Sequence, residues 1–232
     1  MLSEDAVLQH FATWDLNDEE RRYLELHAPR FAYVLPLVAA SEPNRILDVG
    51  PHFLTELLAV SFPNATLHTL GFRNPSCYRE ERVGRHFDFD LNDVQGGVAP
   101  ELPEYDVVVM AEVVEHLYTA PELVLAFVRD MLAPGGRLVL QTPNAAAWNK
   151  RLTLLRGVNP FEPIRESRRN PGHFREYTAA ELRRLGDDVG LEVERLDLVD
   201  YFNAPIRAPA RLLSRLRPRL RQGITVVYRR PD

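Results

Sequence analysis

The sequence is poor in several features that define whole classes of protein. It has one cysteine, Cys77, in 232 residues, which excludes an internal disulfide and is typical of a reducing compartment. It has no apolar run long enough to span a bilayer, and the N-terminal residues MLSEDAVLQH lack the basic and apolar regions of a signal peptide. Together these absences predict a cytoplasmic protein.

The chain also lacks an excess of positive charge. Its formal net charge is −5 at pH 7, whereas proteins that bind nucleic acid usually carry a basic surface, so the charge argues against a nucleic-acid partner. Internal repeats and low-complexity segments are absent from the sequence. A length of 232 residues with 45% hydrophobic residues fits one α/β domain, or one domain with a small appendage.

The stretch from Tyr105 to Asn144 carries most of the structural information. Residues 106–110 are a short, Val-rich apolar run, which is typical of a strand that is covered on both faces. A second apolar run follows at residues 137–141, and the residues between the two runs have the start and stop signals of a helix. The stretch therefore predicts one βαβ unit.

Several short patterns predict where helices begin and end. Three pairs of residues have the spacing of a capping box, in which each side chain binds the backbone N–H of the other: Asn17 with Glu20, Thr119 with Glu122, and Thr178 with Glu181. Pro134-Gly135-Gly136 is expected to end the helix of the βαβ unit and to turn the chain into the next strand.

The rest of the chain alternates between helical and strand patterns. Residues 4–40 are expected to be helical, either as a cover packed on the sheet or as a cap that helps to close the active site. Helices are also expected at 54–60 and from 178 to about 190, and strands at 45–49, 65–70, 86–91, 191–199 and 224–228. This order predicts an α/β fold with a doubly wound, mostly parallel sheet, a helical N-terminal cap at residues 1–44 and a main domain at residues 45–232.

Glu112, Glu115 and His116 follow the strand at residues 106–110 almost at once. Their i, i+3, i+4 spacing predicts that they project from one face of a helical turn. They would lie at the carboxyl end of the strand, where ligands bind in open α/β sheets. Such a cluster can hold a divalent cation, His116 can serve as a general base, or the residues can be structural.

Four segments carry a family resemblance: RILDVG, YDVVVMAEVVEHL, LAPGGRLVLQTPN and GHFREYTAAELRRLGDDVGLEVERL. Together they resemble the class I S-adenosylmethionine-dependent methyltransferases, and the similarity covers roughly residues 45–229. The resemblance implies a Rossmann-like methyltransferase fold with seven strands, of which the last, residues 224–228, runs antiparallel. It also implies S-adenosyl-L-methionine as the cofactor and methyl transfer as the reaction.

The resemblance also implies which residues surround the cofactor. In the family, the acid that matches Asp48 lies near the methionine end of the cofactor, and a glycine turn lets backbone N–H groups approach it. The residues that match Asp90 and Leu91 hold the adenine. The full set of cofactor-binding residues implied in this way is Asp48, Gly50, Gly71, Asp90, Leu91 and Met110.

The cofactor segment departs from the family pattern in two places. The family has a Gly-x-Gly run, where this chain has Gly50-Pro51-His52-Phe53 with only the first glycine. The family also has an acid after the second strand that binds the ribose hydroxyls, and no acid stands at Leu70–Gly71. These departures leave open a non-catalytic, methyltransferase-like binding protein.

The pattern ExxEH resembles the metal site of two groups that methylate oxygen, the ubiquinone-biosynthesis O-methyltransferases and the small-RNA 3′-terminal 2′-O-methyltransferases. In the second group a further histidine ligand lies beyond the fifth strand, and His173 matches its position. The resemblance thus implies Glu112, Glu115, His116 and His173 as ligands of Mg²⁺ or another divalent cation, and it implies catalytic roles for Glu115 and His116.

These likenesses favour O-methylation of a small-molecule, sugar or lipid-linked hydroxyl, with an RNA-terminal 2′-O-methyltransferase as an alternative. The irregular stretch at residues 143–177 is expected to be a lid, and its arginines could bind a phosphate or carboxylate of the acceptor: Arg165, Arg168, Arg169 and Arg175. Residues 204–222 carry six arginines and no acid, which favours peripheral contact with an anionic membrane, contact with an acidic partner, or a packed basic helix. The sequence does not identify the acceptor or the oligomeric state.

Overall fold

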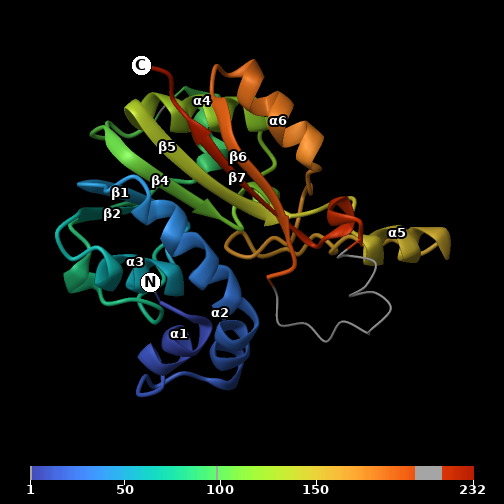
Figure 1. Ribbon diagram of the computed structural model, residues 1–232, viewed down its shortest axis with the longest axis horizontal. Helices are drawn as coiled ribbons and strands as arrows, with labels where there is room; N and C mark the ends of the chain where they lie inside the picture. Colours follow the sequence, from blue (N-terminus) through green and yellow to red (C-terminus); the bar gives the residue numbers. More distant parts are fainter. Residues whose placement is uncertain (1, 98, 202–215) are drawn as a thin grey trace.

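The computed structural model describes residues 2–97, 99–201 and 216–232, and within them seven strands form one sheet (Figure 1). The order of the strands across the sheet is β3-β2-β1-β4-β5-β7-β6. Their bounds are β1 Arg45–Val49, β2 Thr66–Leu70, β3 Arg85–Phe87, β4 Tyr105–Ala111, β5 Leu132–Pro143, β6 Glu192–Val199 and β7 Gly223–Arg229. All neighbouring pairs are parallel except those of β7, which runs antiparallel to both β5 and β6. The predicted fold class and the reversed last strand are confirmed.

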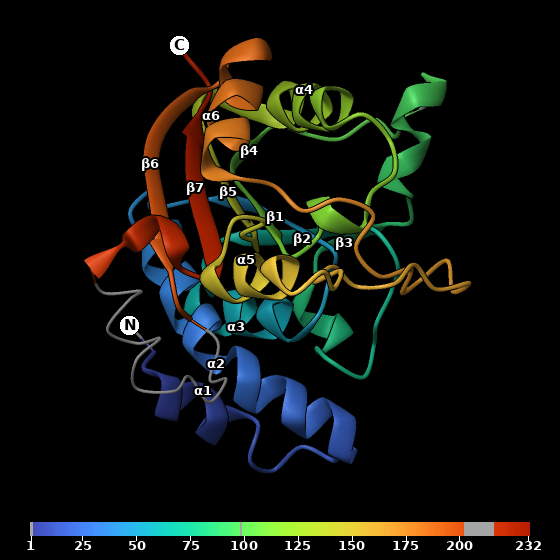
Figure 2. The same ribbon diagram turned by 90° about the vertical axis from the view of Figure 1, so that its right-hand side faces the viewer.

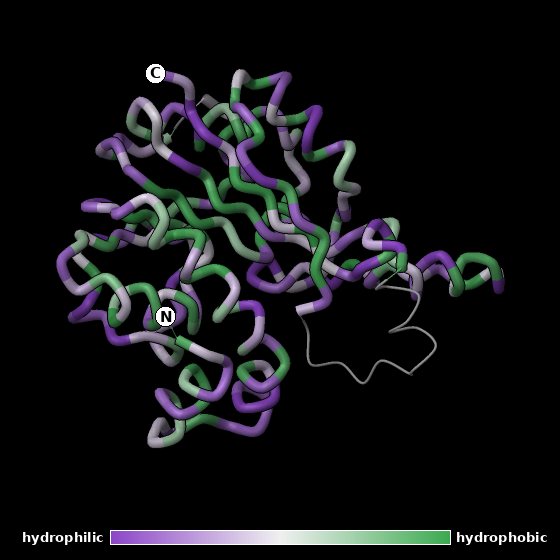
Figure 3. The backbone as a smooth tube through the Cα atoms, in the orientation of Figure 1, coloured by the Kyte–Doolittle hydropathy of each residue, from purple (hydrophilic) through white to green (hydrophobic). Residues whose placement is uncertain are grey.

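Helices cover both faces of the sheet (Figures 1 and 2). One face packs against α1 Glu4–His10, α2 Asp18–Ala39 and α3 Phe53–Ser61, and the other packs against α4 Pro121–Met131 and α6 Ala179–Asp188. The helix α5, Trp148–Leu155, lies apart from these layers (Figure 1). The apolar residues concentrate on the strands (Figure 3), and the buried apolar residues of the helices belong to two cores that share one sheet.

Alternation along β4 divides its side chains between the two cores. Val107 and Val109 belong to the core beneath α1, α2 and α3, whereas Val108 and Met110 belong to the core beneath α4 and α6. This is the period of two that a pleated strand imposes on its side chains. A continuous valine run therefore serves a strand that is buried on both faces, as the sequence predicts.

The N-terminal helical region is two helices rather than one. The first ends at His10, and Asn17 caps the second. The Asn17 side chain accepts from the Glu20 backbone N–H at 2.9 Å, and the Glu20 side chain accepts from the Asn17 backbone N–H at 3.0 Å. The predicted capping box at Asn17 is confirmed, and so is the one at Thr178 and Glu181. The helix start at Asn17 was thus expected, whereas the non-helical residues between His10 and Asn17 were included in the predicted helical region 4–40.

The third predicted capping box, at Thr119, is wrong. The helix α4 begins at Pro121, with Ala120 as its N-cap and without a side-chain cap. Proline at the first helical position fixes φ at a helical value and has no N–H to satisfy, so the helix begins next to it. The Thr119 hydroxyl instead donates to Gln95 Oε1 at 3.4 Å.

Two predicted boundaries near strands are also corrected. The helix α4 ends at Met131, and Pro134-Gly135-Gly136 lies within β5, at an irregularity in its pairing with β4. The predicted strand at residues 86–91 ends at Phe87 because the Asp90 side chain accepts from the Asn92 backbone N–H at 3.0 Å and caps a short 3₁₀ helix, Leu91–Gly96.

The lid and the basic segment are described in part. The lid contains α5, which the sequence reasoning treated as irregular. Residues 204–215 of the basic segment lie outside the described residues, and its remainder includes a short 3₁₀ helix, Pro218–Leu220. Among the described residues, none of the helices is both long and apolar enough to cross a membrane.

Candidate active site

A cavity of about 410 Å³ lies at the carboxyl ends of β1, β2 and β4. Its walls come from α2, from the turns that follow these strands, and from the lid. Parallel strands end together at this edge, so the turns after them converge on one place, as the sequence predicts for a ligand site.

The cavity brings together five of the six residues that the resemblance implied for the cofactor. They are Asp48, Gly50, Gly71, Asp90 and Leu91. Met110 does not line the cavity, because its side chain points into the core beneath α4 and α6. The next residue, Ala111, lines the cavity instead.

Gly50 and Gly71 let two turns pass close to each other. Both have a positive φ, +76° and +125°, which side chains disfavour. The Gly50 N–H donates to the Leu70 carbonyl at 2.9 Å, and a Cβ on Gly71 would lie 3.4 Å from the Gly50 nitrogen. The residues that stand where the family has more glycine, Pro51 and His52, lead directly into α3.

Asp48 is buried at the end of β1, and the Thr55 hydroxyl donates to its Oδ2 at 2.6 Å. Burial raises the pKa of Asp48 to about 7, against the opposing effects of the Thr55 hydrogen bond and the Arg30 charge. This carboxyl group can therefore change its charge near neutral pH when a ligand binds beside it.

Arg30 is a cavity residue that the sequence reasoning missed. It is 2% exposed; its Nε donates to His27 Nδ1 at 3.0 Å and its Nη2 to the Tyr23 hydroxyl at 3.3 Å. Its Nη1 has no partner among the described residues, although the arginine lines the cavity. A buried cationic group with a free donor calls for an anionic ligand.

The sequence did contain a signal for Arg30. It stands in α2 on the same helical stripe as His27, Phe31 and Val34, all of which are buried. A charged residue on an apolar stripe must be paired or functional, because burying an unpaired charge is costly. Burial lowers the pKa of His27 to about 2, so its imidazole is neutral and accepts from Arg30.

The turn after β2 confirms that the ribose acid is absent from this position. Its cavity residues are Gly71, Phe72, Arg73 and Asn74. Asp90, at the opposite side, uses Oδ1 to accept from the Asn92 side chain at 2.9 Å. Its Oδ2 forms an ion pair with Arg168 of the lid at 3.0 Å, so the lid closes over this end of the cavity.

The Glu112–Glu115–His116 cluster does not share one helical face. Glu112 has a φ of +60°, and the chain then forms a 3₁₀ helix, Val114–His116. The prediction of one shared face assumed an α-helical turn and is wrong. The positive φ of Glu112 lies outside the right-handed helical region, so Glu112 is not part of the turn that carries Glu115 and His116. Glu112 lines the cavity, whereas Glu115 is fully buried behind it.

The two carboxyl groups are close enough to affect each other. Burial raises the pKa of Glu112, and burial together with the Glu112 charge raises the pKa of Glu115 well above its usual range. The Thr142 hydroxyl donates to Glu115 Oε2 at 2.9 Å. The other oxygen of Glu115 and one oxygen of Glu112 have no hydrogen-bond partner among the described residues.

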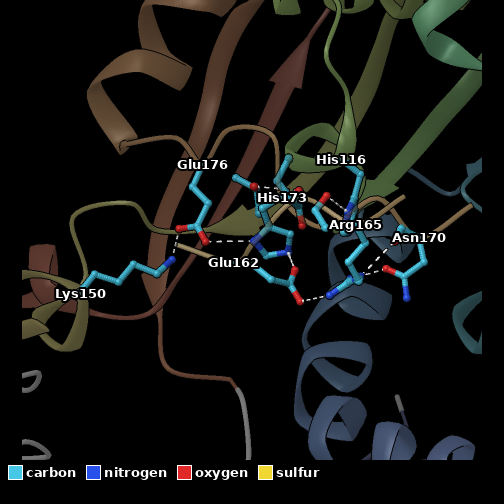
Figure 4. A network of polar contacts seen from close by, with 10 residues as sticks. His116, Lys150, Glu162, Arg165, Asn170, His173 and Glu176 are labelled. Atoms are coloured by element: carbon cyan, nitrogen blue, oxygen red, sulfur yellow. Dashed lines mark hydrogen bonds and ion pairs between the residues drawn. The ribbon is translucent and has the colours of Figure 1, made fainter. Parts of the chain in front are cut away.

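His116 and His173 meet beside this pair (Figure 4). His116 Nδ1 lies 2.8 Å from the Gly172 carbonyl, so it carries the proton and donates, which leaves a lone pair on Nε2. The two imidazole centroids are 4.9 Å apart. The Phe174 N–H donates to the Glu115 carbonyl at 2.8 Å and holds the lid segment that carries His173 in place.

Three of the four predicted metal ligands come together. Glu115, His116 and His173 each offer one ligand atom within 4.8 Å of the others, and Glu112 lies outside this set. Oxygen and imidazole nitrogen donors suit a hard or borderline divalent cation. The three donors therefore fit the predicted divalent cation, with one carboxylate fewer than the predicted four-residue ligand set.

The predicted lid arginines separate into two groups. Arg168 and Arg169 line the cavity. Arg165 pairs with Glu162 and Arg175 pairs with Glu181, so both are used in ion pairs within the lid and at the start of α6.

A family model for a methyltransferase domain matches residues 16–196. The chain belongs to the class I S-adenosylmethionine-dependent methyltransferases. The matched residues include α2 and extend into β6.

Curated relatives of this methyltransferase are distant or cover part of the chain. A protein of Mycolicibacterium smegmatis, described as a probable S-adenosylmethionine-dependent methyltransferase, is 39% identical over 106 residues, which are 44% of this chain and 36% of that protein. The ubiquinone biosynthesis O-methyltransferase of Aeromonas salmonicida is 24% identical over 208 residues, which are 86% of this chain and 85% of that protein.

Solved structures share the fold of the methyltransferase. An O-methyltransferase family protein from Burkholderia thailandensis has a TM-score of 0.60 at 14% identity and covers 99% of this chain and 63% of that chain. The N-methyltransferase NodS from Bradyrhizobium japonicum, solved with S-adenosyl-L-homocysteine, has a TM-score of 0.54 at 15% identity over the whole of both chains. At these identities the likeness shows the fold alone.

Proposed function

We propose that this methyltransferase transfers the methyl group of S-adenosyl-L-methionine to a hydroxyl group of a small-molecule, sugar or lipid-linked acceptor. The observation that carries the proposal is the position of His116, which lines the same cavity as Asp48 and Gly50 and uses Nδ1 to bind the Gly172 carbonyl. The relatives named as ubiquinone biosynthesis O-methyltransferases support oxygen as the acceptor atom.

The residues of the cavity fit the cofactor. Arg30 Nη1 is a buried donor with no partner among the described residues, and it would bind the carboxylate of the cofactor's methionine part. Asp48 would face its ammonium group, and the Gly50 and Gly71 turns allow backbone approach. We call Arg30, Asp48, Gly50 and Gly71 the cofactor wall. When bound, the cofactor supplies an electrophilic methyl group.

His116 would remove the proton of the acceptor hydroxyl. Burial lowers the pKa of His116, so the imidazole is neutral at pH 7 and its Nε2 can accept a proton. The Gly172 carbonyl fixes the tautomer and the ring orientation. Positioning the hydroxyl in line with the methyl group supplies much of the rate in such a reaction. We call Glu115, His116 and His173 the acceptor wall.

A divalent cation is a second way for the same residues to activate the hydroxyl. Glu115, His116 and His173 would hold Mg²⁺ or another divalent cation, which when bound lowers the pKa of a coordinated hydroxyl. The juxtaposition of His116 with His173 also supports the alternative of an RNA-terminal 2′-O-methyltransferase. The net charge of −5 argues against that alternative.

The missing ribose acid motivates the reading as a non-catalytic binding protein. Arg73 and Asn74, rather than an acid, line the cavity after β2. Asn74 can still accept a hydrogen bond from a hydroxyl through its side-chain carbonyl. The buried arginine and the oriented histidine support a working site more than a lost one.

The proposal is tested by incubating the protein with labelled S-adenosyl-L-methionine and a panel of hydroxyl, amine and thiol acceptors. Products are analysed by mass spectrometry, with EDTA or with added Mg²⁺. We expect O-methylated products that disappear in His116→Gln. Loss of product with EDTA would indicate that a divalent cation activates the hydroxyl. Unchanged turnover with EDTA would indicate that His116 acts as the general base. Products methylated only on nitrogen or sulfur, or turnover that survives in His116→Gln, would contradict the proposal.

A further inference from the structure

Exposed apolar side chains concentrate in one short part of the lid. Ten large hydrophobic residues are exposed in the described part of the chain, and six of them lie between residues 152 and 164: Leu152, Leu154, Leu155, Val158, Phe161 and Ile164. Leu155 is 85% exposed. Single exposed apolar residues are normal on a protein surface, whereas a cluster of this kind marks an interaction site. We call residues 148–164 the lid tip.

The helix of the lid tip is not supported by the core. None of the eight residues of α5, all of which are described, is buried. Among the described residues, those of the lid tip belong to neither of the two core clusters. Isolated helices shorter than about 12–15 residues are marginal in water, and most helices are stabilised by packing their apolar side. The described residues therefore leave the apolar side chains of α5 uncovered.

The charge of this region is opposite to that of the whole chain. Residues 148–161 contain Lys150, Arg151 and Arg156 and no acid, and residues 148–169 contain six basic and two acidic residues. Arg151 and Arg156 are exposed beside the leucines of α5. The whole chain has a net charge of −5, so the lid tip is a basic and apolar region on an acidic protein.

The basic and apolar surface continues at the base of the lid. The Asn144 side chain donates to the Arg219 and Arg221 carbonyls at 3.2 and 2.7 Å, which holds residues 216–221 against the start of the lid. Leu216, Arg217 and Arg219 are exposed there. Leucine and arginine mixed on one exposed surface match the boundary between lipid headgroups and acyl chains.

We propose that the lid tip docks on the surface of a bilayer that contains anionic phospholipid. Leu154 and Leu155 enter the acyl boundary, while Arg151 and Arg156 contact lipid phosphates. A second copy of the chain fits this surface less well, because a two-fold contact between identical tips would place their arginines opposite one another.

The lid tip is connected to the acceptor wall. Lys150, in the first turn of α5, forms an ion pair with Glu176, and Glu176 Oε1 lies 3.0 Å from His173 Nδ1 (Figure 4). Glu162, at the other end of the tip, lies 3.7 Å from His173 Nε2. Docking would therefore hold the entrance to His116 and His173 at the bilayer surface. Resting on the proposed function, we infer that the acceptor hydroxyl belongs to a lipid-linked molecule.

The docking is tested by flotation of the full chain with vesicles of phosphatidylcholine, pure or with about 30% phosphatidylglycerol. We expect binding to the anionic vesicles that weakens as salt rises. The double variant Leu154→Gln/Leu155→Gln should bind at least about tenfold more weakly, because two exposed leucines lose their apolar contact. The matched control Leu26→Gln/Leu123→Gln, which alters exposed leucines of α2 and α4, should bind as the unaltered chain does.

Two results would overturn the proposal. One is the absence of binding to anionic vesicles, and the other is equal binding by the tip variant and its matched control. A dimer in sedimentation equilibrium that the tip variant dissociates, without vesicle binding, would assign this surface to a second copy instead.

Cofactor binding, on which the proposed function depends, is tested separately by calorimetric titration with S-adenosyl-L-homocysteine. If the chain binds vesicles but not S-adenosyl-L-homocysteine, the cofactor site fails and the docking stands. The inference about the acceptor is tested by incubating the protein with labelled cofactor and a bacterial lipid extract. Label in the organic phase supports it, and label in water-soluble products alone contradicts it.

Discussion

The cofactor wall and His116 of the acceptor wall line one cavity, but the two walls are held in different ways. The cofactor wall consists of strand ends, two glycine turns and a side chain of α2 that is 2% exposed, all set by the packing of the sheet and its helices. The acceptor wall combines a 3₁₀ turn with lid residues held by a few polar contacts, such as Phe174 N–H to the Glu115 carbonyl. The sheet thus fixes the proposed cofactor site, while the lid can differ in sequence without disturbing the fold.

The largest expected effect lies in the acceptor wall. His116→Gln replaces the imidazole with a neutral amide that cannot take the proton of a hydroxyl. We expect kcat to fall by about 10²–10⁴-fold, the range for loss of a general base. Affinity for S-adenosyl-L-homocysteine should stay within a few-fold. A loss of cofactor affinity as large as the loss of rate would show that the two walls are not separate.

The next effect is the loss of stability when Gly50 of the cofactor wall is replaced, and Gly97 serves as the comparison that separates backbone strain from steric contact. Gly50 and Gly97 both have a φ near +70°, but a Cβ on Gly50 would lie 2.7 Å from Val113 Cγ2, whereas a Cβ on Gly97 meets nothing within 4 Å. Gly97→Ala should cost about 1–2 kcal/mol of the free energy of unfolding through φ alone. Gly50→Ala should cost about 1–3 kcal/mol more through overpacking.

Chemical denaturation of the two glycine variants measures this difference, and calorimetry should show weaker cofactor binding for Gly50→Ala only. Equal stability of the two variants would mean that the neighbouring valine moves aside without cost.

A smaller effect concerns pH. Burial raises the pKa of Asp48 to about 7, so the carboxyl group is increasingly protonated below that pH and cannot pair with the cofactor's ammonium group. Affinity for S-adenosyl-L-homocysteine should therefore rise as pH increases from 6 to 8, by up to about tenfold for one coupled proton. Asp48→Asn should bind with little dependence on pH. Calorimetric titrations at several pH values check this, and a pH dependence that survives in Asp48→Asn would assign it to another group.

The smallest effect is expected at the contact between the lid and the cofactor wall. Arg168 pairs with Asp90 at 3.0 Å, but its side chain is 71% exposed, so the ion pair is strongly screened by water. Arg168→Ala should speed dissociation of S-adenosyl-L-homocysteine by no more than a few-fold, measured by stopped-flow displacement. A much larger effect would show that the lid, and not the sheet, retains the cofactor.

The fold was predictable from local patterns because strand burial and turn residues leave direct marks in the sequence. The valine run forms β4, and the predicted strand before Gly50 is β1. The predicted capping boxes at Asn17 and Thr178 are both formed. The capping box at Thr119 failed because Pro121 started the helix itself. Local spacing alone cannot decide between two start signals that stand next to each other.

The site was less predictable because it depends on backbone dihedrals and on distant contacts. The i, i+3, i+4 spacing of Glu112, Glu115 and His116 suggested one helical face, but a positive φ at Glu112 removes it from the set. Arg30 lies far from the strand ends in sequence, and only the packing of α2 on the sheet brings it to the cavity. The expectation that Met110 contacts the cofactor failed for a simpler reason. The period of two along β4 directs the Met110 side chain into the core beneath α4 and α6.

The most direct test of the account is calorimetric titration of S-adenosyl-L-homocysteine into the unaltered chain and into Arg30→Met, which keeps an unbranched apolar chain but removes the buried charge. Circular dichroism confirms that both are folded. We expect binding to the unaltered chain and affinity about 10–100-fold lower for Arg30→Met, the value of a charged hydrogen bond. Silence in the first titration, or equal affinity in both, would contradict the assignment of this cavity as the cofactor site.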